Sequence, residues 1–455
     1  MAFASIDPHT GSHIARHASL SAAECASVLT AARETYQTWR YLDVTVRCGV
    51  IKRLAEWLRQ DHDRHARLIS SEMGKPLVEA RAEVEKCAWL CEQVTKQAPI
   101  ALAAEDVISD AQCSYVAYLP LGAILAIMPW NYPYWQVFRA VVGAIAAGNV
   151  VLLKHAPNVQ GCAAAITQLF RDAGAPPGLL QNLPVETKLV AELIADPVIA
   201  GVTLTGSTAA GSAVAALAGK HLKPCVLELG GSDPYVILED ANLDQAVQAC
   251  ITARFHNAGQ SCIAAKRVIA VDSVYDAVQQ RLLTEIESLR WGDPLDPETD
   301  LGPMARTDLR EALHQQIAAS TDLGAALLCG GYIPSGTACF YPPTFLAGVK
   351  PGMPAFDEEL FGPALALIRA DDEDDAIALA NRTSYGLGAA IFTERVAHAE
   401  SLCYYDLEAG STFVNGHVRS DPRLPFGGIK NSGWGRELAM AGIRQFCNVK
   451  TIYVQ

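Results

Sequence analysis

One cysteine of this chain lies in a setting suited to nucleophilic chemistry. Cys262 ends the segment Asn-Ala-Gly-Gln-Ser-Cys of residues 257–262, whose composition indicates a loop. Substrate can reach a thiol on such a loop, and nearby backbone N–H groups can stabilise its thiolate. With 13 cysteines in the chain, any one of them is ordinarily a small buried hydrophobe. The polar, glycine-containing approach therefore singles out Cys262.

Two further polar groups could serve the same reaction. Glu228 ends an apolar run just before a glycine pair, where burial should raise its pKa toward that of a general base. Asn131 is a side-chain amide between two prolines. Taken alone, Glu228 fits a paired structural carboxylate and Asn131 a turn residue. Together with Cys262 they supply the base, the oxyanion donor and the nucleophile for covalent catalysis through a thioester.

Composition limits the class of protein. At 455 residues the chain is long for one core, so two or three domains are expected. Half of the residues are apolar and 19% are charged, which is typical of a globular protein. The net charge of −13 argues against a nucleic-acid partner. We find no signal pattern, membrane span, disulfide framework or metal-ligand spacing, so the prediction is a cytoplasmic protein without a metal site.

The segments that must position these groups begin with helices. A capping box at Ser21 starts a helix that runs to about Arg40, and Gly74 is a predicted helix stop. Strands and helices then alternate, which predicts a parallel, helix-covered sheet of Rossmann type that binds its ligand at the strand ends. The predicted early helices are residues 51–62 and 76–98; the alternating strands are 150–153, 180–183 and 202–205; and the helices among them are 161–173, 187–195 and 209–218.

A second α/β pattern begins after Gly231, our preferred domain boundary. Its predicted elements are a strand at 235–238, a helix at 243–255, a strand at 267–271 and a helix at 274–289. Residues 113–119 and 451–454 alternate like exposed strands, which suggests a small oligomerisation sheet.

Five motifs, in order, resemble the aldehyde dehydrogenase superfamily, and most closely its short bacterial succinate-semialdehyde dehydrogenases. The motifs are residues 129–133, 227–231, 259–262, 358–363 and 425–428, and the closer likeness rests on 151–158 and 259–266. The resemblance implies an NAD(P)-binding domain (1–107 and 125–230), a catalytic domain (231–424) and oligomerisation strands (108–124 and 440–455). It also implies a homodimer or a dimer of dimers.

The resemblance implies oxidation of an aldehyde to an acid, with succinic semialdehyde as the expected substrate. Cys262 would form a thiohemiacetal and then a thioester, with Asn131 and the backbone N–H of Cys262 holding the oxyanion. Glu228 would activate the water that releases the acid. Relatives that pass the acyl group to coenzyme A lack this glutamate, so its presence favours hydrolysis.

The cofactor site follows from the resemblance, because the chain has no GxGxxG motif. The resemblance places Ser207 on the pyrophosphate, Lys154 on the adenosine ribose, Glu359 on the nicotinamide ribose and Phe361 beside the ring. It assigns Trp130, Pro157 and Gly206 to the same site. Many NAD-preferring relatives have a glutamate at the position of Pro157, which repels a 2′-phosphate. Proline does not, so NADP is slightly favoured and NAD stays open.

Substrate recognition is predicted to depend on Arg139, which closes an apolar and aromatic segment. Its guanidinium suits the distal carboxylate of a semialdehyde, although from the sequence alone an ion pair at a helix end is about equally plausible. Where some relatives have a second arginine this chain has His256, so Ser420, Arg423 or His256 are the candidates for the missing contact. The predicted walls of the substrate tunnel are Trp135 and Phe426, with Ser261, Tyr132 and Tyr134 beside them.

Three alternatives stay open. The same reaction could act on another aliphatic or aromatic aldehyde, which the aromatic lining permits. A coenzyme A-acylating dehydrogenase is disfavoured by Glu228, and a non-enzymatic protein would bind no nicotinamide.

Some relatives are regulated by a disulfide between the nucleophile and a second cysteine two residues later. This chain has Ala264 at that position, so this local switch is not expected.

Overall fold

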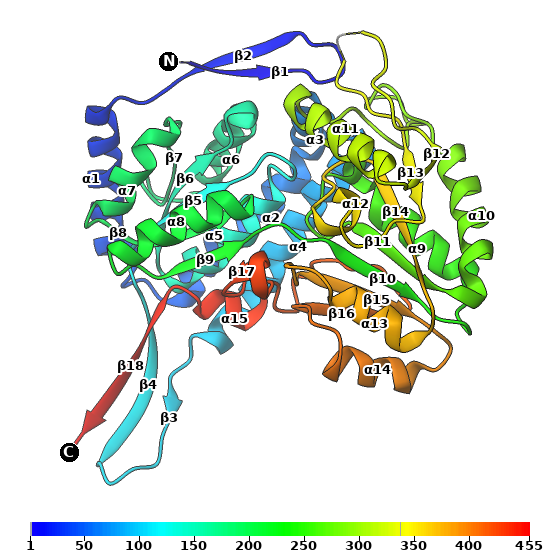
Figure 1. Cartoon of the computed structure of the whole chain (residues 1–455). Helices are drawn as coiled ribbons and strands as arrows, with labels where there is room; N and C mark the ends of the chain where they lie inside the picture. The colour runs from blue at the N-terminus through cyan, green and yellow to red at the C-terminus, as the bar shows by residue number, and fades with distance from the viewer. Residues whose placement is uncertain (1, 337) are drawn as a thin grey trace.

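Two mainly parallel sheets form the frame of the molecule (Figure 1). The computed structural model describes residues 2–336 and 338–455. The first sheet has the strand order β17-β9-β8-β5-β6-β7 and is parallel except for β17. Its strands are β5 (Ala123–Met128), β6 (Val150–His155), β7 (Leu180–Asn182), β8 (Ile199–Thr205), β9 (Cys225–Glu228) and β17 (Gly433–Trp434). All six residues of β6 are buried, as its unbroken aliphatic run predicts.

Helices pack around this first sheet. The predicted capping box is present, because the Ser21 side chain accepts from the backbone N–H of Glu24 while the Glu24 carboxylate accepts from that of Ser21. Gly74 ends α3 in the left-handed conformation, as predicted. The helices are α1 (Ala22–Trp39), α2 (Val44–Gln60), α3 (His62–Met73), α4 (Leu77–Ala101), α5 (Trp135–Ala147), α6 (Gln160–Asp172), α7 (Val190–Ala195) and α8 (Thr208–Lys220), with 3₁₀ turns η1 (Pro157–Val159) and η2 (Thr187–Leu189).

The second sheet has the strand order β12-β13-β14-β11-β10-β15-β16, and only β12 runs antiparallel to its neighbour. Its strands are β10 (Asp233–Ile237), β11 (Ala265–Val271), β12 (Ala326–Cys329), β13 (Thr344–Ala347), β14 (Ala364–Ala370), β15 (Gly388–Phe392) and β16 (Ser411–Val414). The helical segments of this half are α9 (Leu243–Phe255), η3 (His256–Gly259), α10 (Asp272–Ser288), α11 (Thr307–Asp322), α12 (Pro354–Asp357), α13 (Glu373–Asn381) and α14 (Val396–Tyr405). The chain then passes through η4 (Lys430–Ser432) and β17 to α15 (Ala439–Arg444), which packs against α4 and α5 of the first half.

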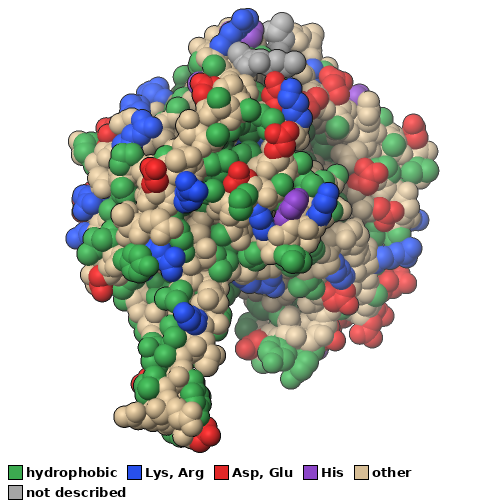
Figure 2. Space-filling view, turned by 90° about the vertical axis from the view of Figure 1, so that its left-hand side faces the viewer, with side chains coloured by type: hydrophobic (Ala, Val, Ile, Leu, Met, Phe, Trp, Pro, Cys, Tyr) green, Lys and Arg blue, Asp and Glu red, His purple; other side chains and the backbone are tan. Residues whose placement is uncertain are grey.

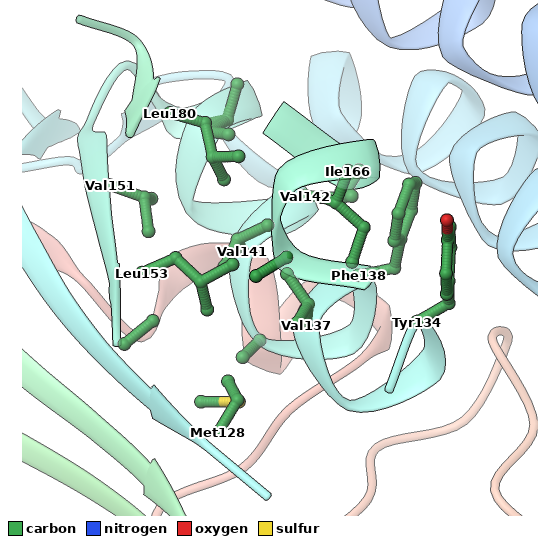
Figure 3. Packing of buried hydrophobic residues seen from close by; sticks show 14 of the residues in the cluster. Met128, Tyr134, Val137, Phe138, Val141, Val142, Val151, Leu153, Ile166 and Leu180 are labelled. Atoms are coloured by element: carbon green, nitrogen blue, oxygen red, sulfur yellow. The ribbon is translucent and has the colours of Figure 1, made fainter. Parts of the chain in front are cut away.

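Helix α5 is anchored by the core of the first half (Figure 3). Its side chains Val137, Phe138 and Val141 are each fully excluded from solvent, and Phe138 lies on the side of Tyr134 and Ile166, away from β6. Burying a side chain of this size contributes roughly 1.5–3 kcal/mol. Trp135 and Arg139, four residues apart, share another face of the helix. The core therefore fixes the side chains that α5 presents to the cavity described below.

A three-stranded arm projects from the body of the molecule (Figures 1 and 2). It has the order β18-β4-β3, from β18 (Cys447–Val454), β4 (Cys113–Pro120) and β3 (Glu105–Asp106). β4 and β18 pair antiparallel along their whole length. The strands expected at 113–119 and 451–454 are therefore present and lie together. That the arm joins subunits stays a prediction.

The structure differs from the predicted secondary structure in several segments of the first half. An antiparallel hairpin of β1 (Ala2–Ile6) and β2 (His13–Ala18) precedes the first helix, where only helices were expected. The helix expected at 51–62 begins earlier, at Val44, because Asp43 caps it by accepting from the backbone N–H of Thr45. The segment 187–195 begins as a 3₁₀ turn and continues as α7. The predicted division into domains stays a prediction.

Candidate active site

Cys262 lies on a tightly held loop between η3 and β11. Asn257, Ala258 and Gly259 all have positive φ, of 57°, 50° and 69°, and turn the chain sharply before the cysteine. Left-handed conformations at non-glycine residues are costly, and they persist where the surroundings fix them. Arg254 fixes this turn, since its Nη2 donates to the carbonyl of Gly259 at 2.8 Å.

The backbone of Cys262 is held from two sides. Lys266 Nζ donates to the carbonyl oxygens of Cys262 and Ser261 at 2.7 and 2.9 Å. A Cβ on Gly231 would lie 2.6 Å from the Cys262 carbonyl oxygen, closer than side chains normally approach. The second residue of the glycine pair therefore has to be glycine for the two segments to meet.

Burial raises the pKa of the Cys262 thiol to about 11. The positive charges of Arg139 and Lys266 act in the opposite direction and favour the thiolate. The thiol is therefore protonated near neutral pH, and it must lose its proton as it attacks. The sequence-based expectation that backbone N–H groups stabilise the thiolate misses this effect of burial.

Glu228 ends β9 with both carboxylate oxygens buried and without a hydrogen-bond partner among the described residues. Burial, and then the nearby charge of Glu437, raise its pKa well above the ordinary value, while Arg139 and Arg436 oppose the shift. A Cβ on Gly427 would lie 2.7 Å from Oε1, so this glycine leaves room for the carboxylate. A buried carboxylate with a raised pKa and free lone pairs is suited to act as a general base.

Asn131 is held next to the cysteine loop. Its Nδ2 donates to the Gln260 carbonyl at 2.9 Å, and Asn257 Nδ2 donates to the Asn131 carbonyl at 2.8 Å. An amide nitrogen carries two hydrogens, so one of them stays free to donate to an oxyanion. The structure thus holds Asn131 against the loop that carries Cys262.

A cavity of about 330 Å³ opens beside Cys262. Ser261, Tyr132 and Trp135 line it, as expected from the sequence. Tyr134 does not belong to this lining. It is fully buried, hydrogen-bonded through its hydroxyl to His65 Nδ1 at 2.7 Å, and packed in the core near Phe138 (Figure 3).

Arg139 reaches the cavity but has a protein partner. Its Nε forms a buried ion pair with Glu437, and its guanidinium lies 4.5 Å from the ring centre of Phe426. Phe426 therefore supports Arg139 instead of forming the predicted tunnel wall. Only Nη2 of Arg139 is buried without a partner among the described residues. Arg139 thus forms an ion pair, which was the alternative to substrate binding in the sequence analysis. Its role in binding substrate stays a prediction.

Of the three candidates for a second carboxylate contact, two line the cavity. Ser420 lies at its wall, and His256 pairs with Glu79 at 3.1 Å. Arg423 is engaged by Asp421 at 2.6 Å, with its side chain exposed. Sequence analysis missed Lys86 on α4, which also lines the cavity. No local sequence signal marked it, because a lysine in a helical segment ordinarily faces solvent.

The predicted cofactor residues lie at the strand ends of the first sheet. Ser207 caps α8 and accepts from the N–H of Ala210, and Gly206 follows β8 directly. Lys154 on β6 is buried, which lowers its pKa, and its ammonium has no hydrogen bond or ion pair with a described residue. Asn158, next to the exposed Pro157, has both side-chain polar atoms buried without a partner in the described chain. These unpaired donors fit a dinucleotide with hydroxyl and phosphate groups.

The residues predicted for the nicotinamide side contact one another or the groups that support the cysteine loop. Trp130 and Phe361 meet edge to face, with ring centres 5.8 Å apart. Glu359 accepts from the N–H of Gly231 at 3.2 Å and pairs with Lys266 at 3.2 Å. The predicted ribose contact thus also belongs to the network that holds Cys262.

Residues 2–336 and 338–455 contain no group of three or more His, Cys, Asp or Glu side chains that could hold a metal ion. Within the same residues, no helix is long and apolar enough to cross a membrane.

Comparison with known proteins gives full-length matches. A profile described as the aldehyde dehydrogenase family matches residues 1–452. A succinate semialdehyde dehydrogenase of Escherichia coli (strain K12), named for NAD(P)+, is 45% identical over 449 residues, which cover 99% of this chain and 97% of that one. A probable succinate-semialdehyde dehydrogenase of Synechocystis, named for NADP(+), is 45% identical over the full length of both chains. The crystal structure of the succinic semialdehyde dehydrogenase of Streptococcus pyogenes in complex with NADP+ has a TM-score of 0.97 at 36% identity, with both chains covered completely.

Proposed function

Because the chain belongs to the aldehyde dehydrogenase family, we propose that it oxidises succinic semialdehyde to succinate with NADP. The family match confirms the predicted enzyme class and the α/β fold. The observation that carries the substrate proposal is the cavity beside Cys262, which combines aromatic walls with the cationic side chains of Lys86 and Arg139. An apolar channel with fixed positive charge suits a short aldehyde that ends in a carboxylate.

The first half of the reaction takes place at Cys262. The Cys262 thiol gives its proton to solvent water as the Sγ atom bonds to the aldehyde carbon, and the carbonyl π electrons move to oxygen, giving a tetrahedral oxyanion. Asn131 Nδ2 and the backbone N–H of Cys262 donate to this oxygen. Lys154 and Ser207 would hold NADP, which would supply the hydride acceptor for this oxidation. Loss of hydride from the former aldehyde carbon leaves a thioester on Cys262.

The second half of the reaction depends on Glu228. Its carboxylate takes a proton from water, and the hydroxide formed bonds to the thioester carbon while the C–S bond breaks. The Cys262 thiolate leaves and recovers a proton, and the acid departs as a carboxylate. The presence of this buried base supports release by water over transfer to coenzyme A.

A substrate panel tests the proposal. Succinic semialdehyde and butanal have the same chain length and differ in the terminal carboxylate. We expect kcat/KM for succinic semialdehyde to exceed that for butanal by about 100-fold, because charged recognition adds roughly 1.5–3 kcal/mol at one contact and more at two. Absorbance of the reduced cofactor gives both values. Equal kcat/KM values would leave the enzyme class intact and remove the proposed substrate.

Pro157 gives a test of cofactor choice. In P157E, a carboxylate would lie three residues after Lys154 at the start of the turn η1 and repel a 2′-phosphate. We expect the Kd for NADP to rise by about tenfold or more, while that for NAD stays within about twofold or falls. Thermal-shift titrations with each dinucleotide measure this without turnover. P157A is the control for loss of the proline ring. An unchanged NADP affinity in P157E would contradict the proposal that residue 157 lies next to the 2′-phosphate.

A further inference from the structure

The cavity beside Cys262 contains a lysine whose charge no carboxylate neutralises. Lys86 on α4 is partly buried, and its Nζ donates to the Ser420 hydroxyl at 3.0 Å. The ammonium also lies 4.3 Å from the ring centre of Trp135. Among the described residues it forms no ion pair. A partly buried cation held in place but left without an anion is arranged for a ligand.

The carboxylates close to Lys86 are engaged elsewhere. Glu83 forms a buried ion pair with Lys75, and its other oxygen accepts from the backbone N–H groups of Tyr134 and Trp135 at 2.8 and 2.9 Å. Asp421 accepts three hydrogen bonds from Arg423.

The other basic side chains of the cavity are weaker candidates for carboxylate binding. Arg139 is paired with Glu437, and His256 with Glu79. Arg419 lines the cavity without an ion pair in the described chain, but it is exposed, so solvent and salt screen its charge.

The Ser420 hydroxyl adds a second donor at the same place. Its oxygen accepts from Lys86 Nζ and from Trp135 Nε1, each at 3.0 Å. These bonds occupy both lone pairs, so the O–H hydrogen has to point elsewhere, and it has no acceptor among the described residues. Lys86 likewise has N–H donors left over after its bond to Ser420.

We propose that Lys86, with the Ser420 hydroxyl, binds the distal carboxylate of the substrate and so selects ω-carboxylated aldehydes. The inference rests on the proposed function, which supplies a carboxylated substrate. In this assignment Lys86 on α4 takes the role of the second arginine that some relatives have at the position of His256. Arg139, buried and paired with Glu437, then contributes positive charge near the carboxylate without binding it directly.

Replacing Lys86 tests the assignment. K86M removes the charge and keeps a side chain of similar length, and K86R restores the charge. We expect K86M to raise KM for succinic semialdehyde by roughly ten- to a hundredfold, with less than about a threefold change for butanal. K86R should recover most of the loss. K96M, on the exposed face of the same helix, is the matched control and should leave both substrates unaffected.

A pH profile separates a charge effect from a packing effect. Burial, with the nearby charge of Arg139, lowers the pKa of Lys86 to about 8. Burial raises the pKa of Cys87 and lowers that of His417, so neither titrates near this pH. The charged and titratable groups that face Lys86 are Glu83 and Cys87 on α4, Arg139 on α5, and His417 and Asp421 after β16. KM for succinic semialdehyde should rise above about pH 8 in the native enzyme, and should stay flat in K86R.

The outcomes are distinct. A selective rise in KM for the charged substrate, with rescue by K86R, supports the assignment. The assignment is overturned if K86M weakens both aldehydes equally. It is also overturned if KM for succinic semialdehyde rises selectively in R419M and not in K86M. If K86M fails to fold, as shown by a lost thermal transition, K86Q replaces it with the same expected result. A native enzyme that does not prefer succinic semialdehyde at all refutes the proposed function instead.

Discussion

Replacing Cys262 by alanine is expected to abolish aldehyde oxidation, with a loss of about four orders of magnitude or more in kcat/KM. The Cβ that remains cannot bond to the aldehyde carbon, so neither the oxyanion nor the thioester forms. Spectrophotometric assays of cofactor reduction with succinic semialdehyde measure the loss. Binding of NADP, followed by thermal shift, should survive because the loop is held through its backbone by Lys266.

The matched control for this variant is C403A. Cys403 is also free and partly buried, but it lies on α14 away from the cavity lining. It should retain normal turnover. Substantial turnover by C262A would refute the covalent mechanism, whichever aldehyde is the natural substrate.

Glu228→Gln is expected to stop the enzyme after one turnover. Acylation of Cys262 should still proceed, giving a burst of reduced cofactor close to one equivalent per active site. Steady-state turnover should then fall by roughly 10²- to 10⁴-fold, because glutamine cannot accept the proton of water. Rapid mixing shows the burst, and intact mass spectrometry shows an acyl group on Cys262. A slow steady state without a burst would mean that Glu228 acts before the thioester forms.

The pH dependence of this step follows from the buried state of Glu228. Burial raises its pKa, so the carboxyl is mostly protonated at low pH and becomes a competent base as the pH rises. Thioester hydrolysis in the native enzyme should therefore accelerate with rising pH, and E228Q should lose that part of the dependence. An unchanged pH dependence in E228Q would assign the titration to another group.

Sequence reasoning was most successful where the signal was local. The strand β6, the cap at Ser21 and the stop at Gly74 each depend on neighbouring residues, and all three are present. The hairpin of β1 and β2 was missed because its support is distant. The Ser5 hydroxyl donates to the carboxylate of Glu72, 67 residues along the chain.

The same distinction applies to the site. The loop position of Cys262 and its nearness to Asn131 follow from short motifs, which the fold brings together as expected. The partner of Arg139 could not be inferred, because Glu437 lies 298 positions away and no local pattern links the two. Lys86 was missed for a related reason. A lysine within a helical segment ordinarily faces solvent, and only the tertiary packing turns this one toward a cavity.

The hairpin at the start of the chain has a mechanical consequence. Its first strand donates to Glu72, the carboxylate that also accepts from the N–H groups of Gly161 and Cys162 at the start of α6. The loop after β1 meets the other half, where the Pro8 carbonyl accepts from the N–H of Cys339 at 2.8 Å. The hairpin of β1 and β2 is thus hydrogen-bonded to both halves of the molecule. A hinge motion that moved the two halves apart would have to break the hairpin's contacts with one of them, so the hairpin limits how far the halves can separate.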